Sequence, residues 1–265
     1  MLRISIMTQK GGLGKSTFTM ILANRLRYYH AEKVLVVDCN VPQISILTNR
    51  ERELKLLEQI KRKKEIGDEL TTKEKAWAIQ FEKTAAKTGI KTFDVVPIYD
   101  KTIQQDYNKL NILAKDYDVV LYDLPGSLED RMLLNVMLTF DYIFVPMEPD
   151  AKSGIKSLAT AAGLYNLKEK FKNSPNTNLQ AVYLFFNKVR NSKQHREEMS
   201  SLYLSSAKKG FEFLTQPDGT PIYVDERVMY QNDLTCSTVF NTEPLLRYTK
   251  AAKLIDSIIK TIRHE

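Results

Sequence analysis

The sequence predicts a single α/β domain, in which helices cover both faces of one doubly wound, mostly parallel sheet. Three observations lead to this prediction. Short runs of aliphatic and β-branched residues alternate with stretches of helical periodicity over most of the 265 residues. Several of these runs are apolar on both faces, which is typical of parallel strands buried between two layers of helices. The first run leads directly into a glycine-rich loop and then a helix, a unit that suits phosphate binding.

Six segments have the composition of strands, because they are short, rich in strand-forming residues and bounded by polar or turn-forming residues. They comprise residues 2–8, 33–38, 93–98, 117–124, 141–147 and 180–187. In an open parallel sheet, ligands collect beyond the carboxyl ends of the strands. We therefore expect the functional residues at those ends.

The helices that begin and end the domain are predicted from apolar residues at helical spacing. The first helix begins at about Lys15, and its buried stripe comprises Phe18, Ile21, Leu22, Leu26 and Tyr29. The last helix spans about residues 244–263 and carries Leu246, Ala251, Leu254, Ile255, Ile258, Ile259 and Ile262. We expect its isoleucines to pack in the core rather than against lipid.

One segment interrupts this alternation within the domain of residues 1–265. Residues of about 49–92 are rich in Glu and Lys and poor in strand formers, which predicts two or three exposed helices inserted after the second strand. Two interpretations stay open. The insertion is either a solvated elaboration of the fold or a surface for a partner or a second subunit.

Composition narrows the class of protein. The net charge of +7 and the pI near 9.1 favour an anionic partner without identifying it. The two cysteines, Cys39 and Cys236, are far apart, which argues against a disulfide scaffold, a zinc ribbon or a cluster ligated by cysteines of one chain. No signal peptide and no apolar run long enough to span a bilayer are visible, so a cytoplasmic protein is expected.

The glycine-rich loop has the sequence TQKGGLGKST, residues 8–17. The usual phosphate-binding pattern, G-x-x-x-x-G-K-[ST], requires a glycine at position 9, where this chain has Gln9 followed by Lys10. A dinucleotide-binding G-x-G-x-x-G pattern fails as well, because position 17 is threonine. The glycines allow close backbone approach, the lysine neutralises phosphate, and the hydroxyl suits Mg²⁺. The expected nucleotide contacts are Gly11, Gly12, Gly14, Lys15, Ser16 and Thr17.

Residues 10–16, K-G-G-x-G-K-[ST], resemble the deviant Walker A loop of the ParA/MinD superfamily of P-loop ATPases. This resemblance implies ATP and Mg²⁺ as cofactors and an ATP-dependent homodimer. It also implies that Lys10 is the family's additional lysine, which reaches the ATP of the partner subunit, while Lys15 serves its own subunit. The missing glycine is then replaced by a second cation.

Three later segments resemble the same family in the same order. YDVVLYDLPG, residues 117–126, resembles its Walker B and switch II region, which implies that Asp123 holds Mg²⁺ through water, together with Ser16 and Asp38. FFNKVRN, residues 185–191, resembles the strand whose final asparagine contacts adenine, so Asn187 is the candidate base contact. PDGTPIYVDERV, residues 217–228, resembles the late loop that closes over the base.

The chain departs from the family after the second strand. The family commonly has D-x-D there, where the acidic groups serve Mg²⁺ and the attacking water, but residues 38–43 are DCNVPQ. Asn40 can hydrogen-bond a water molecule yet cannot accept its proton. The resemblance therefore assigns the catalytic roles to Lys10, Lys15, Asp38 and Asn40, with slow hydrolysis. A natural substitution and an engineered trap of the ATP state both stay open.

Basic charge and the resemblance together predict a ParA-like partition ATPase that binds double-stranded DNA without sequence preference and segregates a plasmid or mobile element. The predicted phosphate contacts are Lys188, Arg190, Arg247 and Lys250. The expected partners are a second copy of the chain, DNA and a ParB-like centromere-binding adaptor, with no membrane. The expected location is the cytoplasm, with nucleoid association in the ATP state.

Two alternatives remain open. One is a MinD-like or secretion-regulating ATPase that acts on a membrane or a protein partner rather than on DNA. The other is a nucleotide-dependent interaction protein that binds ATP as a switch and barely hydrolyses it, which Asn40 favours. A metallocluster carrier is disfavoured, because the cysteines lack ligand spacing.

Overall fold

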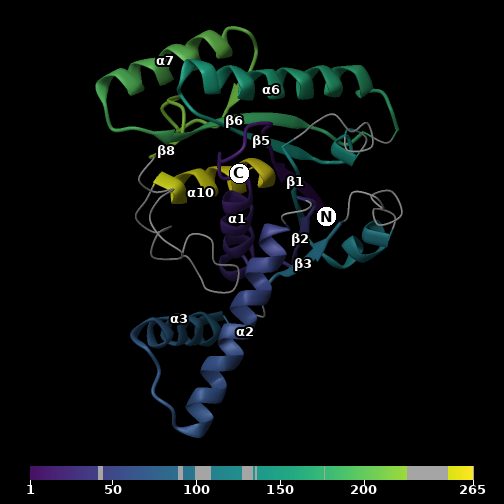
Figure 1. Ribbon diagram of the computed structural model, residues 1–265. Helices are drawn as coiled ribbons and strands as arrows, with labels where there is room; N and C mark the ends of the chain where they lie inside the picture. Colours follow the sequence, from purple (N-terminus) through teal and green to yellow (C-terminus); the bar gives the residue numbers. More distant parts are fainter. Residues whose placement is uncertain are drawn as a thin grey trace.

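The computed structural model describes residues 1–40, 44–88, 92–98, 109–126, 134, 136–175, 177–225 and 250–264. One sheet runs through the domain in the order β3-β2-β4-β1-β5-β6-β7, with β8 also paired to β6 (Figure 1). Every pairing between these strands is parallel. The predicted doubly wound α/β fold is confirmed.

The six predicted strands are present, with ends within two residues of the predicted ones. They are β1 (Leu2–Ile6), β2 (Val34–Asp38), β3 (Asp94–Pro97), β4 (Val119–Asp123), β5 (Tyr142–Met147) and β6 (Ala181–Val189). Two further strands, β7 (Glu212–Phe213) and β8 (Tyr223–Asp225), were not predicted, because strands of two or three residues show no periodicity. Strand β8 corrects the expectation of a loop for residues 223–225 alone, since these residues pair with β6.

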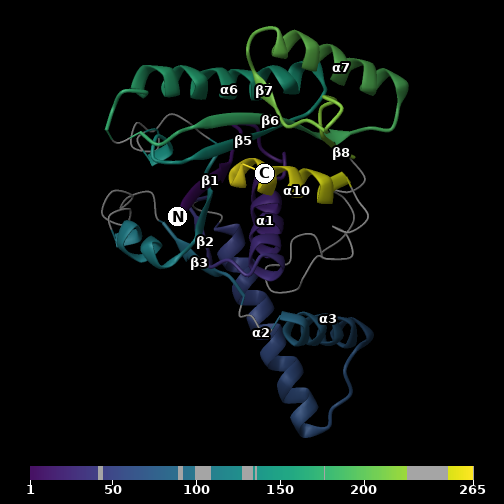
Figure 2. The same cartoon turned by 180° about the vertical axis from the view of Figure 1, so that it is seen from behind.

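Helices lie on both faces of the sheet (Figures 1 and 2). They are α1 (Lys15–Tyr29), α2 (Ser45–Ile66), α3 (Thr72–Thr88), α6 (Ala151–Phe171), α7 (Lys193–Ala207) and α10 (Lys250–Arg263), with the short 3₁₀ helix η2 (Ala114–Asp116) before β4. Side chains of α1 and α10 share one apolar cluster with the sheet, and side chains of α6 and α7 belong to the cluster on the other face. The sheet is thus covered on both sides, as its apolar strands require.

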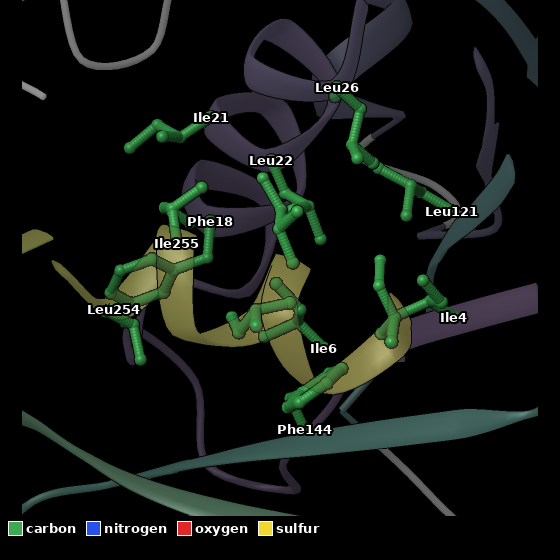
Figure 3. Close-up of a cluster of buried hydrophobic side chains, with 14 of the residues drawn as sticks. Ile4, Ile6, Phe18, Ile21, Leu22, Leu26, Leu121, Phe144, Leu254 and Ile255 are labelled. Atoms are coloured by element: carbon green, nitrogen blue, oxygen red, sulfur yellow. The ribbon is translucent and has the colours of Figure 1, made fainter. Parts of the chain in front are cut away.

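Helix α10 confirms the prediction for the C-terminal isoleucines. Ile255 and Ile258 are fully buried, and Figure 3 shows Leu254 and Ile255 lying against Phe18 and Ile21 of α1. Residues 244–249 of the predicted helix lie outside the described residues. Helix α1 is buried more widely than the single stripe predicted, since Met20 and Ala23 are also in the core. The reason is that α1 packs against both the sheet and α10.

Helices α2 and α3 form a hairpin that projects away from the rest of the domain (Figures 1 and 2). The described part of the predicted insertion thus contains two helices, and the first begins at Ser45, slightly before position 49. Gly67 ends α2 in the left-handed conformation, with φ +76°. Among the described residues, no helix combines the length and apolar character needed to cross a membrane.

Candidate functional site

The glycine-rich loop connects β1 to α1 and leaves the start of α1 open to an anion. Gly12 and Gly14 have φ of +73° and +80°, a conformation that other residues rarely adopt, so both positions need glycine. The first turn of α1 contains no acidic residue, and no side chain of the described residues caps it. Its amides and the helix dipole therefore present positive charge toward the loop, which suits phosphate. Ser16 and Thr17 lie within this first turn and are half-buried.

Two buried carboxylates, Asp38 and Asp123, end the adjacent strands β2 and β4 beside this loop. The two residues are directly paired in the sheet, and both are fully buried. The Ser16 hydroxyl donates a 2.6 Å hydrogen bond to Asp123 Oδ2. The structure thus brings together the three residues that the sequence predicted as Mg²⁺ ligands or water-mediated contacts.

Asp123 has the electrostatics of a cation site. Burial, together with the charge of Asp38, raises the pKa of Asp123 to about 7, although the Ser16 hydrogen bond and Lys15 oppose this rise. Its second oxygen, Oδ1, is buried and has no hydrogen-bond partner among the described residues. A buried carboxylate oxygen without a donor is costly. A hydrated Mg²⁺ would supply the missing donor, so the donor set fits this ion.

Asp38 has a second set of contacts, which the sequence did not reveal. Its Oδ2 accepts hydrogen bonds from the backbone amides of Ile46 at 2.9 Å and Leu47 at 3.1 Å. Its Oδ1 accepts from the amide of Asn40 at 3.3 Å. Asp38 therefore satisfies amides in the first turn of α2, as a helix-capping residue does. Asn40 itself is half-buried next to this carboxylate.

Lys15 lies at the centre of the site, where burial lowers its pKa and the charge of Asp123 partly offsets this effect. The segment after β4 lies against the same loop. A Cβ atom added to Gly126 would lie 3.1 Å from the Gln9 carbonyl oxygen and 3.8 Å from Lys15 Nζ. The close approach explains why glycine occupies this position of the predicted switch II region.

Lys10 forms an ion pair with Glu148 in its own subunit. Glu148 follows β5, and its other oxygen lies 3.5 Å from Lys188 Nζ. One carboxylate thus holds two lysines, one from the loop and one from the end of β6. The sequence prediction did not select Glu148, although its position directly after a buried strand was an available signal.

Helix α6 supports the first part of the loop through two buried hydroxyls. Ser157 lies 3.3 Å from the Thr8 hydroxyl and donates to the Pro146 carbonyl at 3.0 Å. Thr160 accepts from the Gln9 amide at 3.4 Å. The sequence analysis missed both residues, because isolated hydroxyls in a helix carry no pattern that distinguishes them from solvated ones.

Asn187 is fully buried at the end of β6 and is tied to the glycine-rich loop. Its side-chain amide donates to the Leu13 carbonyl at 3.0 Å, and its oxygen accepts from the Lys188 amide at 2.8 Å. Lys188 has φ +56°, a strained value for a lysine. The asparagine therefore holds β6 against the loop in this structure, and the predicted contact with adenine stays a prediction.

The predicted DNA contacts are only partly covered by the described residues. Lys188 points toward Glu148, and Arg190 is exposed at the end of β6. Both line a cavity of about 260 Å³ beyond the ends of β5 and β6, together with Glu148, Asp150 and the first turn of α7. Arg247 lies outside the described residues, and so does the side chain of Lys250.

The chain is similar in sequence to a described protein family and to an archaeal protein. Residues 1–181 match the model of a family described as "AAA domain". An uncharacterized protein of Methanocaldococcus jannaschii, MJECL24, is 30% identical over 226 residues, which cover 77% of this chain and 81% of the relative.

Solved structures share the fold at low sequence identity. A putative plasmid partition protein from Borrelia burgdorferi bound to AMPPNP has a TM-score of 0.60 and 21% identity, covering 98% of both chains. The MinD cell division protein from Aquifex aeolicus has a TM-score of 0.61 and 14% identity, covering 99% of this chain and 97% of that chain. The glycine-rich loop and the paired carboxylates thus lie in a fold shared with these proteins.

Proposed function

We propose that the chain, which belongs to the family described as "AAA domain", is a partition ATPase of the ParA/MinD superfamily of P-loop ATPases. In this proposal, ATP drives dimerisation, the dimer binds DNA without sequence preference, and slow hydrolysis ends the cycle. The observation that carries the ATPase part is the arrangement of an open helix N-terminus, Lys15 and two paired carboxylates within one loop region.

Each residue of the site has a chemical task in this proposal. The loop amides and Lys15 bind the phosphates and offset their charge. Ser16, Asp38 and Asp123 hold Mg²⁺, which supplies charge that neutralises the phosphate oxygens when it is bound. Oδ1 of Asp123, which has no hydrogen-bond partner within the described part of the chain, supports this assignment. Asn187 keeps β6 against the loop, and its predicted contact with adenine would form next to that anchor.

Dimerisation and turnover depend on Lys10 and Asn40. Lys10 is held by Glu148 in the single chain, and the dimer would transfer it to the nucleotide of the partner subunit. Asn40 orients water but accepts no proton, so hydrolysis is slow. The ATP state would consequently be long-lived.

The DNA part of the proposal is supported by the charge of +7 and by the shared fold with a putative plasmid partition protein from Borrelia burgdorferi. Lys188, Arg190, Arg247 and Lys250 would contact phosphates. The ATP dimer would associate with the nucleoid, and a ParB-like adaptor would connect it to the DNA that is segregated.

Size-exclusion chromatography with ATP, with ADP and without nucleotide, each with and without random duplex DNA, tests this function. The proposal predicts a dimer only with ATP and co-elution with DNA only for that dimer. A MinD-like or secretion-regulating switch is the second candidate, supported by the TM-score of 0.61 to the Aquifex protein. An ATP dimer that ignores DNA would favour this second candidate.

A further inference from the structure

Asp38 links the candidate nucleotide site to the α2–α3 hairpin through one carboxylate. Its backbone is fixed in the sheet by pairing with Pro97 and Asp123. Its side chain accepts the amides of Ile46 and Leu47, the second and third residues of α2. The group expected to face Mg²⁺ is therefore also the group that caps the helix. A contact between this carboxylate and Mg²⁺ would therefore alter its hydrogen bonds to the amides of α2.

The turn before α2 is strained in this capped arrangement. Ile44 has φ +33° and ψ +52°, in the left-handed region. This region is unfavourable for a β-branched side chain, and such residues persist only where surrounding contacts impose them. The Ile44 amide donates to the Asn40 carbonyl at 2.8 Å, so the strained residue is tied to the residue beside the carboxylate. A change of the cap would relieve this strain, which favours a second arrangement of the turn.

The two helices of the hairpin are joined to each other by their own contacts. Leu57 and Ile60 of α2 and Ala78 of α3 are buried, and Lys63 pairs with Glu74 across the two helices at 2.8 Å. Thr71 and Glu74 form a reciprocal capping box at the start of α3. The Lys63–Glu74 pair thus joins the two helices directly, and Figures 1 and 2 show the hairpin projecting from the sheet.

Between the cap and this outer part, Arg50 anchors α2 to the domain. Arg50 is 7% exposed, donates to the Phe93 carbonyl at 2.6 Å and stacks on the Phe93 ring, with its guanidinium carbon 4.4 Å from the centroid. This contact lies about one helical turn beyond the residues capped by Asp38. A shift of the first turn can thus pivot the helix about this anchor.

We propose that Asp38 makes the α2–α3 hairpin a reporter of the nucleotide state. Its carboxylate caps α2 in the arrangement described here, and engagement by the hydrated Mg²⁺ of a bound nucleotide weakens this cap and reorients the hairpin. This inference rests on the proposed Mg²⁺-nucleotide site. In this proposal, the surface that the hairpin presents differs between the chain with Mg²⁺-nucleotide and the chain without it.

Energy transfer from Trp77 to bound mant-AMPPNP tests this inference, because Trp77 is the sole tryptophan and lies on α3. The same fluorescence reports binding of the nucleotide. At saturating nucleotide, addition of Mg²⁺ should change the transfer efficiency in the wild-type chain. Hydrogen exchange should show faster exchange at the amides of Ile46 and Leu47 under the same conditions, whereas the outer turns of α2 should be unaffected.

Two variants separate coupling from simple folding effects. Asp38→Asn retains an oxygen that can accept both amides but lacks the charge for Mg²⁺, so its hairpin should no longer respond to the ion. Ile44→Asn relieves the strain, since asparagine tolerates the left-handed region. It should slow exchange of the two amides in the nucleotide-free chain by about fivefold or more, the factor that corresponds to the lower end of such strain.

The outcomes are distinguishable. If mant-AMPPNP binds but Mg²⁺ changes neither the transfer efficiency nor the hydrogen exchange of the Ile46 and Leu47 amides, the coupling is overturned. The proposed nucleotide site then stands. A Mg²⁺ response of equal size in Asp38→Asn would also overturn it. Failure of mant-AMPPNP to bind at all would reject the proposed function and, with it, this inference.

Discussion

The glycine-rich loop and the α2–α3 hairpin are stabilised in opposite ways. Contacts of the loop come from segments that are distant in sequence, such as Ser16 with Asp123 and Asn187 with Leu13. Contacts of the outer part of the hairpin are local, such as Lys63 with Glu74, and only the start of α2 is anchored to the domain, by Asp38 and Arg50. The loop consequently depends on the folding of the whole sheet, whereas the outer part of the hairpin depends mainly on contacts between its own helices. Changes in the hairpin should therefore leave nucleotide binding intact, except at Asp38, where the two regions meet.

The largest expected effect is on turnover, within the loop region. Asn40→Asp restores a carboxylate beside Asp38, and general-base or water-positioning help is typically worth about a hundredfold or more. We expect a comparable increase in the rate of ATP hydrolysis and a shorter-lived ATP dimer, measured by phosphate release and size-exclusion chromatography. An unchanged rate would mean that another group positions the water.

Substitution of the two loop lysines should affect different properties: nucleotide affinity for Lys15 and dimerisation for Lys10. Lys15→Ala should weaken ATP binding by roughly tenfold to a hundredfold, because a charge-assisted contact contributes about 1.5–3 kcal/mol. Lys10→Ala should bind ATP nearly normally yet remain monomeric. Calorimetric titration and size-exclusion chromatography measure the two effects. Equal loss of nucleotide affinity in both variants would contradict the cross-subunit assignment of Lys10.

The buried Asp123 predicts a pH dependence of stability that the hairpin should not show. Its pKa is raised to about 7 in the folded chain, so the folded state holds a proton that the unfolded state has lost above about pH 4. Without Mg²⁺, this group should lower the free energy of unfolding by about 1 kcal/mol per pH unit between pH 5 and 7.

Asp123→Asn removes this titration and is the matched control. Chemical denaturation of both chains at about pH 5, 6, 7 and 8 gives the comparison. The stability of the wild type relative to the variant should fall as the pH rises and then level off above pH 7. A constant difference would show that Asp123 is already ionised throughout this range.

The smallest effect is expected for the surface of the hairpin. Lys64 pairs with Glu82 at 2.6 Å, but both side chains are largely exposed. Lys64→Ala should therefore change the free energy of unfolding by less than about 1 kcal/mol and leave ATP affinity unaltered. A large loss of ATP affinity in this variant would break the separation between the two regions.

The sequence predicted the strands well where the apolar runs were long. It predicted the loop residues well because their residue types are specific to phosphate binding. Apolar runs gave the central strands, and the glycine-rich loop gave Lys15 and Ser16. Residues that act through distant contacts, such as Glu148 and Thr160, were missed, because only the folded chain brings them to the loop. The cap formed by Asp38 was missed for the same reason. Strand β8 was missed because three residues carry no period.

A salt titration of binding to random duplex DNA, with ATP and with ADP, tests the central claim most directly. Phosphate contacts release counterions, so the ATP form should bind with a log–log slope of about −0.9 per neutralised phosphate, and Arg190→Ala should reduce this slope by about one unit on all sequences alike. The account predicts this binding with ATP and its loss with ADP. Binding that ignores the nucleotide, or no binding at low salt, would contradict a partition function.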